Sequence, residues 1–318
     1  MEAVLKYYLV GALANIGLIY GLVLLYGLSG STLLGEIGTQ FDPGNTVALA
    51  LALSLVLVGL GFKAGYVPAH FWIPDVYQGA MVPVAALLAV LPKVAALLAV
   101  TRLVSAFPVQ DLNWPPLVAG LSAVTMTWGN LAAFRQEDIR RLLGYSSISQ
   151  SGYLLMGTVA LPESPLALAG LLYYFAAYAA ANLGAFAVLS ASGRMTIADN
   201  AGLIQRQPWL AFAMVISLLS FMGLPPLAGF VGKFVLFTAS FQAGYAWLTI
   251  VALVNSVLSL YYYLRVIAPM FLQPAPQPDA SVNAYGTIVA VTGALALLIL
   301  GIGAFFLLNT TPSLTLLL

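Results

Sequence analysis

Residues 47–77 read VALALALSLVLVGLGFKAGYVPAHFWIPDVY, an apolar run of 31 residues that contains Lys63, Gly65 and Pro68. Because about 20 apolar residues suffice to cross a bilayer, this run is too long for one straight helix. Proline removes a backbone donor and clashes with the preceding turn. Freed backbone groups at membrane depth are tolerated only where protein or water satisfies them. The run therefore predicts a discontinuous transmembrane helix.

The composition of the whole chain indicates a polytopic helical membrane protein. Of its 318 residues, 62% are hydrophobic and 7% are charged, and the mean hydropathy is +0.99. We predict an all-α bundle with about nine transmembrane spans, two of them discontinuous, because apolar runs of about 20 residues recur throughout. The spans cover roughly residues 3–28, 47–77, 82–103, 116–134, 143–161, 166–190, 209–241, 244–270 and 284–308.

A second over-long run, residues 209–241, contains Gly223-Leu-Pro-Pro226 ahead of Lys233. The two broken spans are second and seventh in order, five apart, so units of five helices would insert with opposite topology. This offset predicts the inverted repeat of antiporter-like transporters. Within one membrane domain over 1–318, the predicted parts are 1–114 for the end of the first repeat, 115–271 for the second, and 272–318 for a linker and final transmembrane helix.

Three lysines, Lys63, Lys93 and Lys233, lie deep in apolar stretches. A lysine at the centre of a membrane helix costs roughly 2.5 to 3.5 kcal/mol on insertion scales. The cost is avoided by a water-filled cavity, a partner group or loss of the proton, and all three describe a proton path. The alternative is structural, since Lys63 and Lys233 could stabilise carbonyls of the broken helices or reach the interface as long side chains do.

Four other polar residues have two interpretations each. His70 follows the first break and is either a proton shuttle or a structural hydrogen-bonding group. Asp75 fits a cap or tether of the second half-helix better than a proton carrier. Tyr145 and Gln150 belong to an unusually polar start of the fifth span, where side chains either bond helix to helix or line water.

The sequence excludes several kinds of site. The chain has no cysteine and one histidine, which leaves no iron–sulfur ligation, no disulfide and no multi-histidine metal site. It lacks a Gly-x-Gly-x-x-Gly or phosphate loop, and it has no basic aromatic groove for nucleic acid. We therefore expect no cofactor, metal or nucleic acid in this chain.

The basic residues predict the orientation, because lysine and arginine are enriched in cytoplasmic loops. With nine spans, most of them fall on one face, which predicts a cytoplasmic N-terminus and a C-terminus on the opposite side. The residues on that face are Lys6, Arg135, Arg140, Arg141, Arg194, Arg206 and Arg265, whereas Arg102, Glu36, Asp42, Asp111 and Glu163 fall on or near the other.

Several motifs together resemble the antiporter-like membrane subunits of complex I, and most closely its subunit N. They occur in the order of that family and cover nearly the whole chain. The motifs are Gly61-Phe-Lys-Ala-Gly-Tyr-Val-Pro-Ala-His-Phe-Trp-Ile-Pro-Asp-Val-Tyr-Gln-Gly79, then Pro83 and Pro92-Lys93, Arg140-Arg-Leu-Leu-Gly-Tyr-Ser-Ser-Ile-Ser-Gln-Ser-Gly-Tyr153, Gly223-Leu-Pro-Pro-Leu-Ala-Gly-Phe-Val-Gly-Lys-Phe234, and Leu260-Tyr-Tyr-Tyr-Leu-Arg265.

The resemblance implies proton translocation coupled to NADH oxidation by quinone. Lys63, Lys93 and Lys233 match the family's proton-carrying lysines of helices 7, 8 and 12, so the first span here corresponds to helix 6 and the last to helix 14. NADH, flavin, iron–sulfur clusters and quinone are then expected in partner subunits, with other membrane subunits of complex I and the lipid bilayer as neighbours. The expected location is an energy-converting membrane, namely the bacterial plasma membrane.

Two departures from the family pattern stand out. The resemblance implies about five further helices before this start, one with a glutamate that pairs with the lysine matched by Lys63, so either the chain is a fragment or a neighbour supplies the carboxylate. Gln150 stands where the family often has histidine, and glutamine cannot take up a proton. Alternative functions are a subunit of a multisubunit sodium/proton antiporter or membrane-bound hydrogenase, or a non-conducting scaffold.

Overall fold

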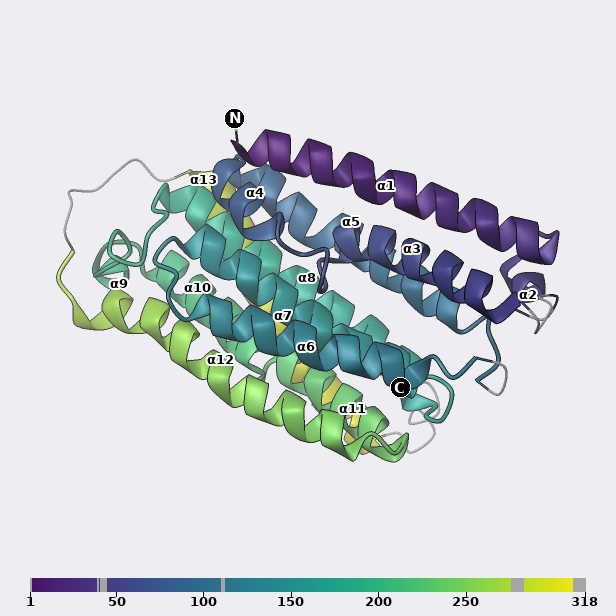
Figure 1. The fold of residues 1–318 in the computed structure, drawn as a ribbon. Helices are drawn as coiled ribbons and strands as arrows, with labels where there is room; N and C mark the ends of the chain where they lie inside the picture. The colour runs from purple at the N-terminus through teal and green to yellow at the C-terminus, as the bar shows by residue number, and fades with distance from the viewer. Residues whose placement is uncertain (1, 39, 41–44, 110–111, 276–282, 311–318) are drawn as a thin grey trace.

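The computed structural model describes residues 2–38, 40, 45–109, 112–275 and 283–310 as a bundle of helices (Figure 1). Extended pairing in these residues is limited to one isolated bridge between Asp138 and Thr196. The all-α prediction is confirmed. Two acidic residues used in the orientation argument, Asp42 and Asp111, lie outside the described residues.

Six helices in the described part are long and apolar enough to cross a membrane, which agrees with the prediction of a polytopic membrane protein. They are α1 (Glu2–Ser29), α3 (Thr46–Ala64), α5 (Val82–Val104), α8 (Leu166–Ser192), α12 (Ala246–Leu272) and α13 (Ala284–Thr310). The remaining helices are shorter or more polar: α2 (Leu34–Ile37), α4 (Ile73–Gly79), α6 (Pro115–Ala133), α7 (Ile139–Ala160), α9 (Leu203–Arg206), α10 (Pro208–Met222) and α11 (Ala228–Gln242).

The helices stop and restart inside both over-long apolar runs. Between α3 and α4 the chain leaves the helix at Gly65, and between α10 and α11 it does so at Gly223. Both glycines have a left-handed backbone, with φ of +75° and +81°, which glycine adopts without the clash a Cβ would cause. The count of nine crossings, and the joining of each pair of half-helices into one crossing, stay predictions.

Helix α7 lies inside the bundle and packs against α4, α5, α6, α8 and α11. All of its residues from Ser146 to Ala160 are buried. It begins four residues before the predicted span 143–161, because the Asp138 carboxylate caps its first turn by accepting from the backbone N–H groups of Arg140 and Arg141 at 2.9 and 3.3 Å. A hydropathy pattern alone excludes this charged first turn.

Helices α6 and α7 approach each other closely at two glycines. A Cβ on Gly129 would lie 2.5 Å from the backbone nitrogen of Ser149, and one on Gly152 would lie 2.6 Å from that of Met126. The Ser122 hydroxyl also donates to the carbonyl of Gly152 at 2.7 Å. Small residues at such positions let helix backbones meet in a membrane. The two helices therefore form one tightly joined pair.

Candidate proton path

Lys93 lies on α5 with an exposed fraction of 1%. Its ammonium group donates to the carbonyl of Ser147 at 2.5 Å, to the hydroxyl of Ser147 at 2.5 Å and to the hydroxyl of Ser151 at 2.8 Å. The same nitrogen lies 5.6 Å from the centre of the Tyr178 ring. Each of these partners is neutral. The site therefore satisfies the hydrogen-bonding capacity of the amine without fixing its charge by an ion pair.

Lys93 is also connected to the first helix break. The Ser151 hydroxyl donates to the carbonyl of Ala64, the last residue of α3, at 2.7 Å. A Cβ on Gly65 would lie 3.5 Å from the Lys93 nitrogen. The carbonyl end of a helix carries partial negative charge, which favours a cation nearby. Interrupting α3 thus gives Lys93 an electrostatic environment that an unbroken helix could not provide.

Lys233 occupies the corresponding place at the second break. It is 3% exposed, and its ammonium group donates to the carbonyls of Phe221 and Met222, the last residues of α10, at 2.8 and 3.3 Å. The nitrogen lies 4.3 Å from the centre of the Tyr153 ring. Its contact with the hydroxyl of Ser256 on α12 is longer, at 3.4 Å. Lys233 therefore interacts directly with the carbonyl end of a half-helix.

Side chains of α7 and α8 join the two lysine sites. At the Lys93 end, the hydroxyls of Ser147 and Tyr178 lie 2.8 Å apart. At the Lys233 end, the Tyr174 hydroxyl donates to the side-chain oxygen of Gln150. The amide nitrogen of Gln150 in turn donates to the carbonyl of Phe221 at 3.3 Å, the same carbonyl that accepts from Lys233.

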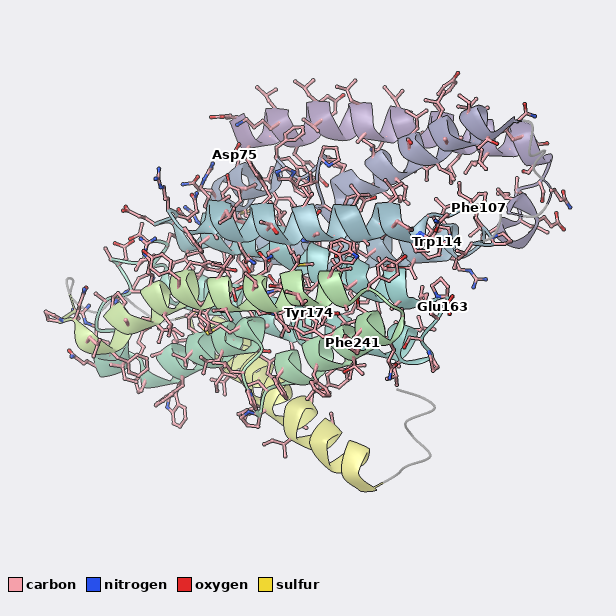
Figure 2. The ribbon with its side chains drawn as sticks, turned by 60° about the horizontal axis from the view of Figure 1, so that its bottom comes forward. Asp75, Phe107, Trp114, Glu163, Tyr174 and Phe241 are labelled. Atoms are coloured by element: carbon pink, nitrogen blue, oxygen red, sulfur yellow. The ribbon has the colours of Figure 1, made fainter. Side chains whose placement is uncertain are left out.

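The resulting chain of hydrogen bonds has one gap. Its two halves are separated by a single helical turn, because Ser147 and Gln150 are three apart on α7 and Tyr178 and Tyr174 are four apart on α8. Figure 2 shows Tyr174 in the middle of the bundle. A buried hydroxyl both donates and accepts, so a row of hydroxyls can pass a proton by reorienting. The arrangement provides a polar axis between the two breaks.

Lys63 differs from the other two lysines. Its burial was expected, but the side chain is exposed and forms no hydrogen bond or ion pair with any described residue. It lines an open groove of about 740 Å³ bounded by α1, α3, α4 and α5. The expectation of burial fails because the position of a lysine within an apolar run does not specify which face of the helix carries it.

Asp75 takes the tethering role that its position favoured. Its carboxylate accepts from Lys6 of α1 at 2.5 Å and pairs with Arg141 of α7. Arg141 also donates to the side-chain oxygen of Gln78 at 3.2 Å. The short helix α4 is thereby held to α1 and α7 at one end of the bundle, and the carboxylate is engaged with these two cations rather than with Lys63.

His70 and Tyr145 are placed away from the axis. The half-buried His70 ring packs edge to face on Trp128 of α6, with ring centres 6.0 Å apart. The Tyr145 ring lies 5.9 Å from the guanidinium carbon of Arg141. In the described residues neither side chain hydrogen-bonds to a lysine. Of the six predicted site residues, the structure therefore brings together Lys93, Gln150 and Lys233.

The sequence analysis missed the residues that complete the axis, namely Ser151, Tyr174, Tyr178 and Ser256. Two spacings could have indicated them. Serines four apart on α7 and tyrosines four apart on α8 each place hydroxyls on one helix face. In an apolar helix such a repeated polar face has to meet either another polar face or water.

Comparison with known proteins identifies the family. The family model described as "NADH:quinone oxidoreductase/Mrp antiporter, TM" matches residues 1–259. The chain belongs to this family. It is 45% identical to NADH-quinone oxidoreductase subunit N 1 of Streptomyces griseus over 312 residues, which are 97% of this chain and 66% of that protein. It is also 45% identical to subunit N of a Mycobacterium species over 305 residues, 95% of this chain and 65% of that protein. The chain thus spans just under two thirds of the length of these curated relatives.

Solved structures of family members share the fold. A chain of respiratory complex I from Thermus thermophilus, solved with bound Aureothin, superposes with a TM-score of 0.84 at 39% identity, covering 97% of this chain and 68% of that one. A chain of the Mrp complex from Dietzia superposes with a TM-score of 0.84 at 26% identity, covering 97% and 66%. The antiporter-like architecture predicted from the sequence is confirmed.

Proposed function

We propose that this chain acts as a proton-translocating membrane subunit of an NADH:quinone oxidoreductase. The observation that carries the proposal is the buried Lys93, whose hydrogen-bond partners are all neutral and belong to a polar axis that reaches Lys233 across a gap of one helical turn. An amine held by neutral groups can exchange a proton with its neighbours, whereas an ion-paired amine is held in its charged form. The 45% identity to two subunit N proteins supports the assignment.

Electron transfer belongs to other subunits in this proposal. NADH, flavin, iron–sulfur clusters and quinone are assigned to partners, because the chain offers neither cysteine nor a nucleotide motif. In the described part of the chain, no three His, Asp or Glu side chains group into a metal site. This chain contributes the proton path, and a change of charge in a neighbouring subunit shifts protons along it.

The proposal also assigns the chain to a membrane, an orientation and a repeat structure. The helices α1, α3, α5, α8, α12 and α13 place the chain in a membrane; we assign it to a bacterial energy-converting membrane with a cytoplasmic N-terminus. Residues 1–114 and 115–271 are assigned to two inverted repeats, followed by 272–318. Lys63, in its open groove, is assigned to exchange protons with a carboxylate supplied from outside the present sequence.

A sodium/proton antiporter subunit is the second candidate. It is favoured by the likeness to the Dietzia Mrp chain, whose TM-score equals that of the complex I chain. Ion flux in vesicles separates the two candidates, since NADH-driven proton uptake that is independent of sodium supports the first and strict sodium dependence supports the second. A non-conducting scaffold is the third, and it predicts that the lysines are dispensable for pumping.

The deciding experiment is Lys93→Met in the complete membrane complex. Methionine keeps the length of the side chain and removes the amine, so we expect NADH-driven proton uptake by inverted vesicles to fall at least about tenfold while assembly is retained. Lys6→Met, at the partly exposed end of α1, is the control and should keep pumping. Full pumping by Lys93→Met in an assembled complex would reject the proposal and favour the scaffold.

A further inference from the structure

An open cavity of about 680 Å³ lies between the C-terminal end of α5, the connector that follows it, and the turn between α7 and α8. Figure 2 shows Trp114 and Glu163 at this end of the bundle and Asp75 at the other. Arg102 and Glu163 both line the cavity. Two opposite charges on its wall make it a place for water rather than for lipid chains.

The inner end of the cavity carries a buried pair of hydroxyls. Thr101 lines the cavity, and its hydroxyl oxygen lies 2.8 Å from that of Thr158 on α7. The two side chains are 6% and 1% exposed. A threonine hydroxyl has one donor and two acceptor positions, so the pair keeps acceptor capacity beyond its mutual hydrogen bond. These hydroxyls can extend a chain of water molecules from the cavity into the bundle.

Thr101 lies on the same face of α5 as Lys93. Lys93, Leu97 and Thr101 are spaced four apart on α5 and therefore share one face of that helix. Two helical turns, or about 12 Å, separate Lys93 from Thr101. On α7 a similar interval of seven residues separates Ser151, which holds Lys93, from Thr158, which contacts Thr101. Two polar pairs thus face each other across the same pair of helices.

Buried leucines occupy the helix positions between the two polar pairs. Leu97 of α5 is 1% exposed, and Leu154 and Leu155 of α7 are 0% and 1% exposed. A narrow apolar constriction excludes water and blocks ions until its walls move or become polar. From the cavity inwards, the threonine pair is followed by the leucines and then by Lys93 with Ser151. A channel closed by an apolar gate has this sequence of polar, apolar and polar segments.

We infer that the cavity is an access route for protons to Lys93 from the side of the membrane opposite Asp75, closed by a gate of Leu97, Leu154 and Leu155. This inference rests on the proposed function. When the gate is hydrated, the Lys93 ammonium passes one proton to an adjacent water molecule and becomes a neutral amine. The proton then leaves past the threonine pair into the cavity, and the reverse transfer recharges the amine.

Cysteine labelling tests the cavity, since these 318 residues contain no cysteine, and labelling of the unsubstituted complex gives the background. In the assembled complex, Thr101→Cys should react with a membrane-impermeant maleimide added on the side opposite Asp75, because a thiolate forms only where water reaches it. Leu91→Cys, on the 63% exposed outer face of the same helix, is the control and should stay unlabelled. Labelling of Thr101→Cys no faster than that of the control, or only from the other side, would overturn the inference.

A leak measurement tests the gate. In vesicles without NADH, Leu97→Asn should raise passive proton entry about tenfold, equivalent to about 1.4 kcal/mol in the barrier to wetting, whereas Leu91→Asn should not. Adding Lys93→Met to Leu97→Asn should abolish the leak if the route passes through Lys93. An unchanged leak in Leu97→Asn, or a leak that survives the second substitution, would contradict the gate. The NADH-driven pumping of Lys93→Met alone reports separately on the proposed function.

Discussion

The two helix breaks have a common local design and differ in how a lysine uses it. At both breaks the first half-helix ends in a left-handed glycine, Gly65 or Gly223. At the second break the ammonium group of Lys233 binds the terminal carbonyls directly. At the first, Ser151 stands between the terminal carbonyl and Lys93. The difference shows that the buried lysine at a break can belong to the broken helix itself, as Lys233 does, or to a neighbouring helix, as Lys93 does.

Lys63 and Lys233 lie near the two breaks in sequence but have different environments. Lys63 lies in α3 just before the first break, so its position in the sequence mirrors that of Lys233 just after the second. Their surroundings are unlike, since Lys233 is buried against carbonyls and Lys63 lines an open groove. In this chain the equivalent of Lys233, judged by environment, is therefore Lys93.

The largest effect is expected for Lys233→Met, with Lys63→Met, at the other break, as its comparison. Lys233→Met removes the donor to two buried carbonyls, which should cost about 1–3 kcal/mol of unfolding free energy and reduce pumping at least about tenfold. Lys63→Met should lower the thermal stability less, because within the described residues the Lys63 side chain is exposed and has no hydrogen-bond partner to lose. Thermal unfolding of the assembled complex and proton uptake measure both. Equal destabilisation by the two substitutions would contradict the difference in environment between the buried Lys233 and the exposed Lys63.

Ser151→Ala tests the indirect arrangement at the first break. It leaves the carbonyl of Ala64 without its partner and removes one acceptor from Lys93, so we expect a loss of about 2 kcal/mol and slower pumping. Thr292→Ala, at an exposed position of α13, should change neither quantity. A Ser151→Ala variant as stable and active as the parent would show that the serine does not connect Lys93 to the break.

The glycines test whether the breaks depend on backbone conformation. Gly65→Ala and Gly223→Ala should each cost at least about 1–2 kcal/mol, because an L-residue is strained in the left-handed region, and the new methyl group at 65 would also clash with the Ile73 side chain. In addition, the new methyl group at 223 would meet the Lys233 side chain at 2.9 Å. Gly244→Ala has φ of +83° and open space around it, so it measures the strain alone. If Gly223→Ala pumps as well as Gly244→Ala, the contact with Lys233 is unimportant.

Asp75→Asn should have the smallest effect of these substitutions. The carboxylate and its two partners are partly exposed, and water and salt weaken ion pairs in such positions. We expect a small drop in the melting temperature that shrinks further as the salt concentration rises, with pumping retained. Loss of pumping would instead make Asp75 part of the path.

The class of fold and the burial of two of the three lysines agree with the predictions from the sequence, for physical reasons that can be stated. Apolar runs of membrane length, with proline and glycine at their centres, locate helices and helix breaks without tertiary information. Lys93 could be singled out because it is central in its run, whereas its burial is decided by the packing of α5 against α7 and α8.

The failures have a different physical origin. Lys63 was misjudged because the exposed or buried face of an apolar helix is decided by packing, and nearly every face of α3 is apolar in sequence. Tyr174 and Tyr178 were overlooked because tyrosine in a membrane helix is equally suited to the interface. Only their hydrogen bonds to Gln150 and Ser147 reveal a role in the axis.

The close contact of α6 and α7 at Gly129 and Gly152 determines what can move when a proton passes. Backbones that touch at two levels cannot slide past each other without collision, and α7 carries Ser147, Gln150 and Ser151. The helix backbones therefore stay fixed. The groups that are free to reorient are the side-chain hydroxyls, one carboxamide and two amines. If the chain passes protons as proposed, the transfer in this part of the molecule would proceed by torsional rotation of side chains rather than by displacement of whole helices.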